Sequence, residues 1–120
     1  MNSYAPYSQF NVGAALLAAD GRVFTGANIE NASLGLSICA ERVALGAAIS
    51  AGARSFSAVA VAGEGALGIL PCGACRQALA EFSPSMIVLR CHPDGSFDSR
   101  SLADLVPAPF TGGELELAGA

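Results

Sequence analysis

The stretch FNVGAALLAADGRVFTGANI, residues 10–29, consists of two short apolar segments on either side of the dipeptide Asp20-Gly21. Asp-Gly is a strong signal for a tight turn between antiparallel strands, because glycine readily adopts the positive φ angle that such a turn requires. The stretch therefore predicts a β-hairpin. A sheet that begins with this hairpin contains at least one antiparallel pair of strands.

Helical and strand-like segments alternate after the hairpin. A helix is expected over residues 38–50, where small apolar side chains recur on one face, and Gly52 is expected to cap its end. Residues 55–63 and 85–92 are almost continuous apolar runs, which are typical of strands covered on both faces. A second helix is expected between them, over residues 72–82. This alternation predicts a mixed sheet with helices packed on it.

The length of the chain predicts its domain organisation. A chain of 120 residues fits one domain, so residues 1–120 are expected to form a single unit. A final strand or short helix is expected after the strand at residues 85–92, and residues 101–110 are expected to form a short helix and an irregular tail. The glycine-rich end, residues 112–120, is expected to be flexible. Hydrophobic residues make up 52% of the chain and charged residues only 13%, which is typical of a globular protein. The low charged fraction also agrees with a surface that partner subunits partly cover.

The charges argue against a polynucleotide partner. The net charge is −4, and the six basic residues are arginines scattered along the chain without forming a run. Nucleic-acid binders draw their affinity from clustered lysines and arginines, so a small-molecule partner is favoured. No apolar run approaches the roughly 18 residues that cross a membrane. The first residues also lack the pattern of a signal peptide, so a cytoplasmic protein with reduced cysteines is expected.

Three of the four cysteines lie where helices are expected to begin. Cys39 lies at the start of the first expected helix, while Cys72 and Cys75 lie at the start of the second. Residues three apart share one face of a helix, and a helix amino terminus favours the negatively charged thiolate. Three thiolates suit zinc and leave its fourth tetrahedral position for water, which is typical of a catalytic metal.

Two other interpretations of these cysteines stay open at this point. The Cys72-x-x-Cys75 pair alone is also compatible with a thiol-redox protein. A closed zinc site in a binding module would need a fourth ligand, for which Cys91 and His92 are the candidates. Cys91 is more simply explained as a buried core thiol.

Glu41 favours a catalytic zinc. This residue follows Cys39 by two positions, with the small Ala40 between them, so its carboxylate can reach a metal-bound water without binding the metal. The motif C-A-E at residues 39–41, followed by P-C-G-A-C at residues 71–75, resembles the zinc-dependent nucleoside deaminases.

The resemblance narrows to the small, three-cysteine cytidine deaminases, which are homotetramers. It extends over YAPYSQFNVGAAL (residues 4–16), TGANIENASLGLSICAERVA (residues 25–44), PCGACRQALAEF (residues 71–82) and LADLVPAPF (residues 102–110). It implies a three-layer α/β/α sandwich, one Zn²⁺ per chain and the hydrolysis of cytidine and deoxycytidine to uridine and deoxyuridine with release of ammonia. Pyrimidine salvage is the role that this activity implies.

The resemblance also implies roles for residues around the metal. Glu41 would move protons between water, ring atom N3 and the departing amine, with Cys39, Cys72 and Cys75 as the zinc ligands. Arg42 would donate hydrogen bonds to the cysteine sulfurs and so offset the negative charge of three thiolates.

The remaining implied roles concern the substrate. Asn28 and Glu30 would hold the ribose hydroxyls, and Phe10 would pack on the pyrimidine ring. Ala40 would also contact the substrate, and Phe110 would reach the active site of a neighbouring subunit.

The chain departs from the family pattern in two places. The family helix that precedes YAPYSQF is expected to be absent, because only three residues stand before Tyr4. Leu34 replaces a family tyrosine, which suggests a wider pocket. A deaminase of a modified cytosine nucleoside, N4-substituted or similar to an aminoacylnucleoside antibiotic such as blasticidin S, is therefore the main alternative.

Overall fold

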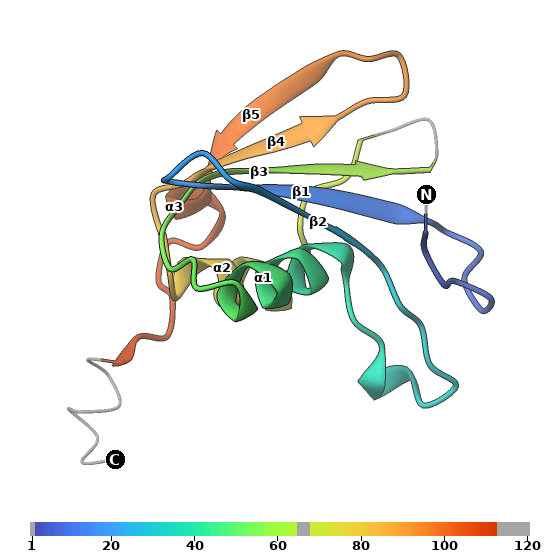
Figure 1. Ribbon diagram of the computed structural model, residues 1–120. Helices are drawn as coiled ribbons and strands as arrows, with labels where there is room; N and C mark the ends of the chain where they lie inside the picture. Colours follow the sequence, from blue (N-terminus) through green and yellow to red (C-terminus); the bar gives the residue numbers. More distant parts are fainter. Residues whose placement is uncertain (1, 65–67, 113–120) are drawn as a thin grey trace.

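The computed structural model describes residues 2–64 and 68–112. Five strands form one sheet in the order β2-β1-β3-β4-β5 (Figure 1). The strands are β1 (Val12–Ala18), β2 (Val23–Ala27), β3 (Phe56–Gly63), β4 (Ile87–Cys91) and β5 (Phe97–Ser101). The helices are α1 (Ala40–Ser50), α2 (Gly73–Ala80) and α3 (Leu102–Leu105), with a 3₁₀ turn, η1 (Leu34–Leu36). Residues 113–120, most of the end expected to be flexible, lie outside the described residues.

The hairpin predicted from Asp20-Gly21 is confirmed. β1 and β2 pair antiparallel, and Gly21 has a φ angle of +95°, which glycine tolerates better than any other residue. The expected C-terminal cap of α1 is confirmed as well, because Gly52 has a φ angle of +94°. Local turn chemistry therefore sets both the start of the sheet and the end of its first helix.

The sheet is mixed, as predicted. β1 also pairs antiparallel with β3, whereas β3 and β4 run parallel and are joined through α2. β4 and β5 form a second hairpin. The sequence pattern predicted either a strand or a short helix after β4. The structure has both, because β5 pairs with β4, and α3 follows β5 directly and buries Leu102.

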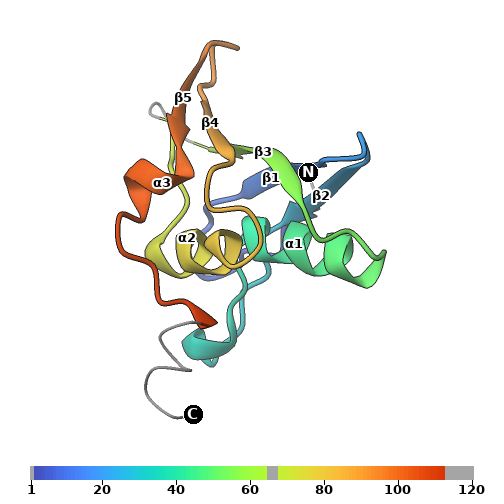
Figure 2. The ribbon, with the colours of Figure 1, turned by 90° about the vertical axis from the view of Figure 1, so that its left-hand side faces the viewer.

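The described helices α1 and α2 lie side by side on the same face of the sheet (Figures 1 and 2). The described residues therefore form two layers of the expected three-layer α/β/α sandwich. The strand connections explain this arrangement: the β1–β2 and β4–β5 links are short hairpins, so only the β2–β3 and β3–β4 links carry α1 and α2. No helix in the described part of the chain is long and apolar enough to cross a membrane.

The core lies between the sheet and the two helices. Alternate residues of β1, β3 and β4 face the helices, and Leu16, Val59, Val61 and Val88 are fully buried there. Each such side chain stabilises the fold by roughly 1.5–3 kcal/mol through removal of its apolar surface from water.

Gly26 on β2 sets the position of the first helix. A Cβ atom at this position would overlap the Ala40 carbonyl oxygen and the Ala44 nitrogen, so α1 rests on the strand backbone without an intervening side chain. The helix faces the sheet with small side chains, since Ala40, Ala44 and Ala48 have no exposed surface. This close approach places the start of α1, and with it Cys39, directly beside the sheet.

The β4–β5 hairpin is held by an ion-pair cluster around Asp98. Its carboxylate accepts hydrogen bonds of 2.9 Å from both Nε and Nη2 of Arg90, and it lies 3.0 Å from Nη1 of Arg100. Nε2 of His92 also lies 2.9 Å from this carboxylate. The Arg90 guanidinium, followed by the His92 ring, holds the pKa of Asp98 well below its usual range.

We expect Asp98→Asn to lower the Tm at pH 7 by a few degrees. A carboxyl with a depressed pKa in the folded state contributes its full stabilisation above its unfolded pKa of about 3.9. The contribution declines below that pH and is lost completely only when the pH falls through the folded pKa. The Tm difference between the variant and the parent should therefore shrink below about pH 4. Thermal unfolding at pH 7 and at pH 3 measures it; an equal difference at both would contradict a role for the Asp98 charge.

Candidate metal centre and active site

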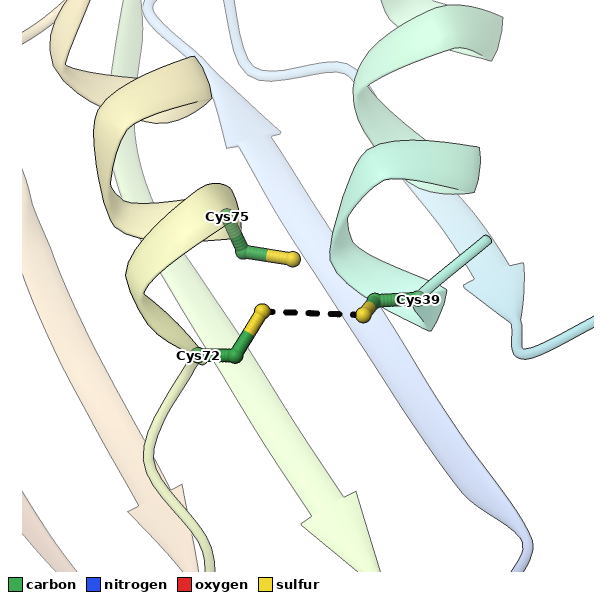
Figure 3. Close-up of side chains that lie close together, drawn as sticks. All are labelled: Cys39, Cys72 and Cys75. Carbon is green, nitrogen blue, oxygen red and sulfur yellow. Dashed lines mark hydrogen bonds between the residues drawn. The ribbon is translucent and has the colours of Figure 1, made fainter. Parts of the chain in front are cut away.

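The amino termini of α1 and α2 bring three thiols together. Cys39 is the N-cap residue of α1, Cys72 is the N-cap residue of α2, and Cys75 lies in the first turn of α2. Figure 3 shows the three side chains pointing toward one another. Their sulfur atoms all lie within 4.8 Å of one another, and the Cys39 and Cys72 sulfurs are 3.6 Å apart.

This donor set fits zinc. Zinc–thiolate bonds of about 2.3 Å in a tetrahedron place the sulfurs about 3.8 Å apart, which is close to the spacing of Cys39 and Cys72. Among the described residues, the cluster contains these three ligands and neither Cys91 nor His92. His92 is engaged elsewhere, because its Nδ1 accepts a hydrogen bond from the Gly68 N–H and its Nε2 bonds to Asp98. The closed four-ligand site considered from the sequence is therefore not formed by these candidates.

The thiols have different electrostatic environments. Burial raises the pKa of Cys72, but hydrogen bonds from Cys75, Cys39 and the Ala74 N–H outweigh this effect and lower it. The pKa of Cys75 is strongly raised, first by burial and then by the negative charges of Glu41 and the other thiolates. A divalent cation would compensate the charge of a buried Cys75 thiolate, which is a further reason why the cluster suits a metal.

Arg42 lies beside the thiols, as the resemblance implies. Its Nη2 is 3.6 Å from the Cys39 sulfur, and hydrogen bonds to Cys39 and then to Cys75 raise the pKa of the guanidinium. Within the described structure, its Nε is buried without a hydrogen-bond partner. The guanidinium thus brings positive charge to the sulfurs at the start of α1.

A cavity of about 170 Å³ opens next to the thiols. Glu41 lines it with a side chain that is only 4% exposed, and Ala40 and Asn28 contribute to the same wall. Cys39 and Cys72 also face this space. The remaining lining residues are Val12, Ile69 and Leu70.

These three apolar residues are the part of the site that sequence reasoning missed. Val12 belongs to the first strand of the hairpin, and its period-two pattern suggests an ordinary sheet position. Ile69 and Leu70 lie just before Pro71, and this position next to P-C-G-A-C is the signal that places them near the metal. A cavity lined by apolar side chains together with a buried carboxylate suits a flat, partly apolar ligand.

Asn28, which lines this cavity, is bonded to the backbone of Phe10. The Asn28 amide donates a 2.9 Å hydrogen bond to the Phe10 carbonyl and accepts one of 3.0 Å from the Val12 N–H. The Phe10 ring lies against Gly63, where a Cβ atom would come within 3.0 Å of the ring and 2.8 Å of Ile69. Phe10 and Ile69, which is part of the lining, therefore lie next to each other.

Glu30 holds the loop that carries Phe10. Its carboxylate accepts hydrogen bonds from the Tyr7 N–H (3.0 Å), the Ser8 N–H (3.1 Å) and the Ser8 hydroxyl. The hydrogen bond from the Ser8 hydroxyl is the main cause of a lowered Glu30 pKa. The Ser8 oxygen in turn accepts a hydrogen bond from the Phe10 N–H. Sequence reasoning placed Glu30 at the ribose but did not identify this loop-holding role.

Four residues singled out from the sequence for the substrate pocket do not line the cavity. Phe10 and Glu30 are absent from its lining, although Asn28, which lines it, bonds to the Phe10 carbonyl. Phe110 is 57% exposed and does not line it, and its backbone is bonded instead to Gln77 on α2. Leu34, on η1, is 73% exposed and is not part of the lining either. Within one chain, the replacement at Leu34 therefore does not widen the pocket.

Comparisons with known proteins agree with this geometry. The family model described as the cytidine and deoxycytidylate deaminase zinc-binding region matches residues 1–91. A cytidine deaminase of Sporosarcina psychrophila is 45% identical over 117 residues, which cover 97% of this chain and 86% of that protein. A cytidine deaminase of Halalkalibacterium halodurans is 48% identical over 110 residues, with 91% and 83% covered.

A solved structure extends the similarity to three dimensions. The crystal structure of cytidine deaminase from Burkholderia pseudomallei matches with a TM-score of 0.86 and 50% sequence identity, covering 91% of this chain and 88% of that one. The family model covers more than half of the chain and includes all three thiols and Glu41. On these grounds the chain belongs to the cytidine and deoxycytidylate deaminase family.

Proposed function

We propose that this protein hydrolyses cytidine and deoxycytidine to uridine and deoxyuridine with release of ammonia. The observation that carries the proposal is the buried Glu41 carboxylate, which lines the same cavity as Cys39 and Cys72. A carboxylate beside a metal centre but outside its ligand set is suited to general acid–base work on a water molecule. The relatives named cytidine deaminase support cytidine as the substrate.

Glu41 moves the protons of this reaction. Zinc bound by Cys39, Cys72 and Cys75, one ion per chain, supplies a Lewis acid and lowers the pKa of a water that it binds. Glu41 accepts a proton from the water and delivers it to ring atom N3. The water oxygen forms the new bond to C4 and becomes a hydroxyl group there. Glu41 then takes the remaining proton of this hydroxyl and passes it to the amino group, so that the bond from C4 to nitrogen breaks, ammonia leaves and the C4 carbonyl of uridine forms.

Neighbouring residues orient the substrate and balance the charge. Asn28 and Glu30 hold the ribose hydroxyls, for which an amide and a carboxylate are suitable partners. Phe10 packs on the pyrimidine ring, and Ala40 forms the cavity wall beside it. Arg42 offsets the negative charge of the thiolates from its position 3.6 Å from the Cys39 sulfur.

The proposal extends to assembly and cellular role. The single domain of residues 1–120 forms a homotetramer, and Phe110 of each subunit enters the active site of a neighbour. The high exposure of this aromatic ring in one chain supports the idea, since large exposed aromatic side chains are typical of interfaces. The enzyme acts in the cytoplasm in pyrimidine salvage, on nucleosides rather than on nucleic acid.

The test is the ultraviolet absorbance of cytidine and deoxycytidine incubated with the zinc-loaded protein, together with an ammonia assay. We expect conversion to uridine and deoxyuridine with one ammonia released per nucleoside. Absence of turnover despite one bound zinc per chain would overturn this substrate assignment in favour of a modified cytosine nucleoside. Absence of zinc as well would favour a thiol-redox protein.

A further inference from the structure

The backbone of Phe110 is held by a single side chain on α2. Gln77 Nε2 donates a 2.8 Å hydrogen bond to the Phe110 carbonyl, and its Oε1 accepts one of 3.2 Å from the Phe110 N–H. Both hydrogen-bonding groups of this residue are therefore satisfied by one amide side chain, whereas the ring itself stays exposed. Such two-point bonding fixes the residue while leaving its ring free to contact something else.

Gln77 and the metal ligands occupy different faces of α2. Cys75 points toward the other two thiols. Gln77 lies two residues further along, and residues two apart on a helix do not share a face. A second contact joins α2 to the start of the same tail: Arg76 donates a hydrogen bond to the carbonyl of Leu105, the last residue of α3 (3.5 Å). One face of α2 thus supports its own metal site while another supports the tail of residues 105–110.

The tail leads away from the site of its own chain. In Figure 1 the segment that follows α3 leaves the body at the end opposite the 28–37 loop, which leads to Cys39. None of the described residues of this segment, 106–112, lines the cavity. If Phe110 serves an active site, that site belongs to another subunit.

We propose that Gln77 is a positioning residue for the active site of the neighbouring subunit. This inference rests on the proposed function, in which Phe110 acts across the subunit interface. Gln77 holds the Phe110 backbone so that its ring closes the neighbour's nucleoside pocket. α2 therefore carries two zinc ligands of its own active site and also positions the phenylalanine that closes the active site of the neighbouring subunit.

The first test is Gln77→Met, which keeps the length of the side chain and its helix propensity but removes both hydrogen bonds. We expect the KM for cytidine to rise about tenfold, as the loss of two hydrogen bonds allows. The kcat should change less than about threefold, because the chemistry of Glu41 is untouched. Gln77→Glu keeps the acceptor for the Phe110 N–H and should show an intermediate KM. Glu81→Gln, an exposed change at the end of the same helix, is the matched control and should leave KM unchanged.

The second test separates action on the neighbour from action within one chain. Subunits with Gln77→Met are co-expressed with Glu41→Gln subunits under different affinity tags, and doubly tagged tetramers are purified. In these tetramers the Glu41→Gln subunits cannot turn over cytidine but still present a correctly held Phe110. Some active sites of Gln77→Met subunits then receive Phe110 from a Glu41→Gln subunit, so we expect part of the activity to show the KM of the parent. The same partial recovery is expected when Phe110→Ala replaces Gln77→Met.

The outcomes distinguish this inference from the proposed function. Two results would overturn only the role of Gln77. One is a Gln77→Met enzyme with the parent KM. The other is a raised KM in Gln77→Met that mixing with Glu41→Gln subunits does not restore, although the same mixing restores Phe110→Ala. A Phe110→Ala enzyme with the parent KM would overturn the interface role of Phe110 and the inference with it. Independently of activity, hydrogen exchange of the Phe110 N–H should be faster in Gln77→Met, and unchanged exchange would contradict the bonding described.

Discussion

Replacement of Glu41 by glutamine should lower kcat for cytidine by about 10⁴-fold, the upper end of what one general acid–base group contributes. The upper end is expected because the same carboxylate serves transfers to ring N3 and to the leaving ammonia. Glutamine has nearly the same size, so it preserves the packing of a side chain that is only 4% exposed. The variant should therefore bind zinc and fold like the parent.

Three measurements check this prediction: single-turnover kinetics, zinc content by atomic emission, and the Tm. Glu81→Gln serves as the matched control, since it removes the charge of an exposed glutamate outside the cavity. A Glu41→Gln enzyme that keeps its zinc and retains more than about 1% of the parent kcat would contradict a proton-transfer role for this carboxylate.

Cys75→Ser should abolish both metal binding and activity. Cys75 is fully buried and its sulfur lies within 4.8 Å of the other two, and a serine hydroxyl at this place is neither a thiolate nor long enough to replace one. The site would keep two sulfur ligands, and zinc content should fall well below one ion per chain. Because a ligand that binds the folded state stabilises it, the Tm of the purified variant should also fall and no longer respond to added zinc.

Cys91→Ser is the control that makes this result specific. Cys91 is a free thiol on β4 outside the cluster, so its replacement should leave zinc content and kcat unchanged. Equal loss of zinc in both variants would mean that a general loss of thiols or of folding explains the result. Full zinc binding and activity in Cys75→Ser would overturn the three-ligand assignment.

Local signals in the sequence predicted the parts of this fold that depend on short-range geometry. Asp20-Gly21 predicted the hairpin because a positive φ angle is a property of the residue itself. The metal cluster followed from short motifs, since each cysteine lies at a helix start that its own neighbours define. The sequence also predicted the apolar strand β3, whose composition alone distinguishes it.

Other features depend on contacts between distant residues, and no local pattern reports them. β5 has the polar sequence FDSRS and becomes a strand because β4 pairs with it. The bonds between Gln77 and Phe110 join residues 33 positions apart, and those between Glu30 and Ser8 join residues 22 apart. The placement of helices on one sheet face followed from the connections between strands rather than from any segment by itself.

The hydrogen bonds that Glu30 makes to Tyr7 and Ser8 have a consequence for protein engineering. A designer who wished to admit nucleosides with altered sugars would first mutate Glu30, the residue proposed to hold the ribose. The same mutation would release the loop that positions Phe10, so the enzyme would tolerate altered sugars but would bind the pyrimidine base more weakly. Asn28 offers no independent route, because its amide donates a hydrogen bond to the Phe10 carbonyl and accepts one from the Val12 N–H. In this scaffold, sugar selectivity and the position of Phe10 are therefore coupled through both residues.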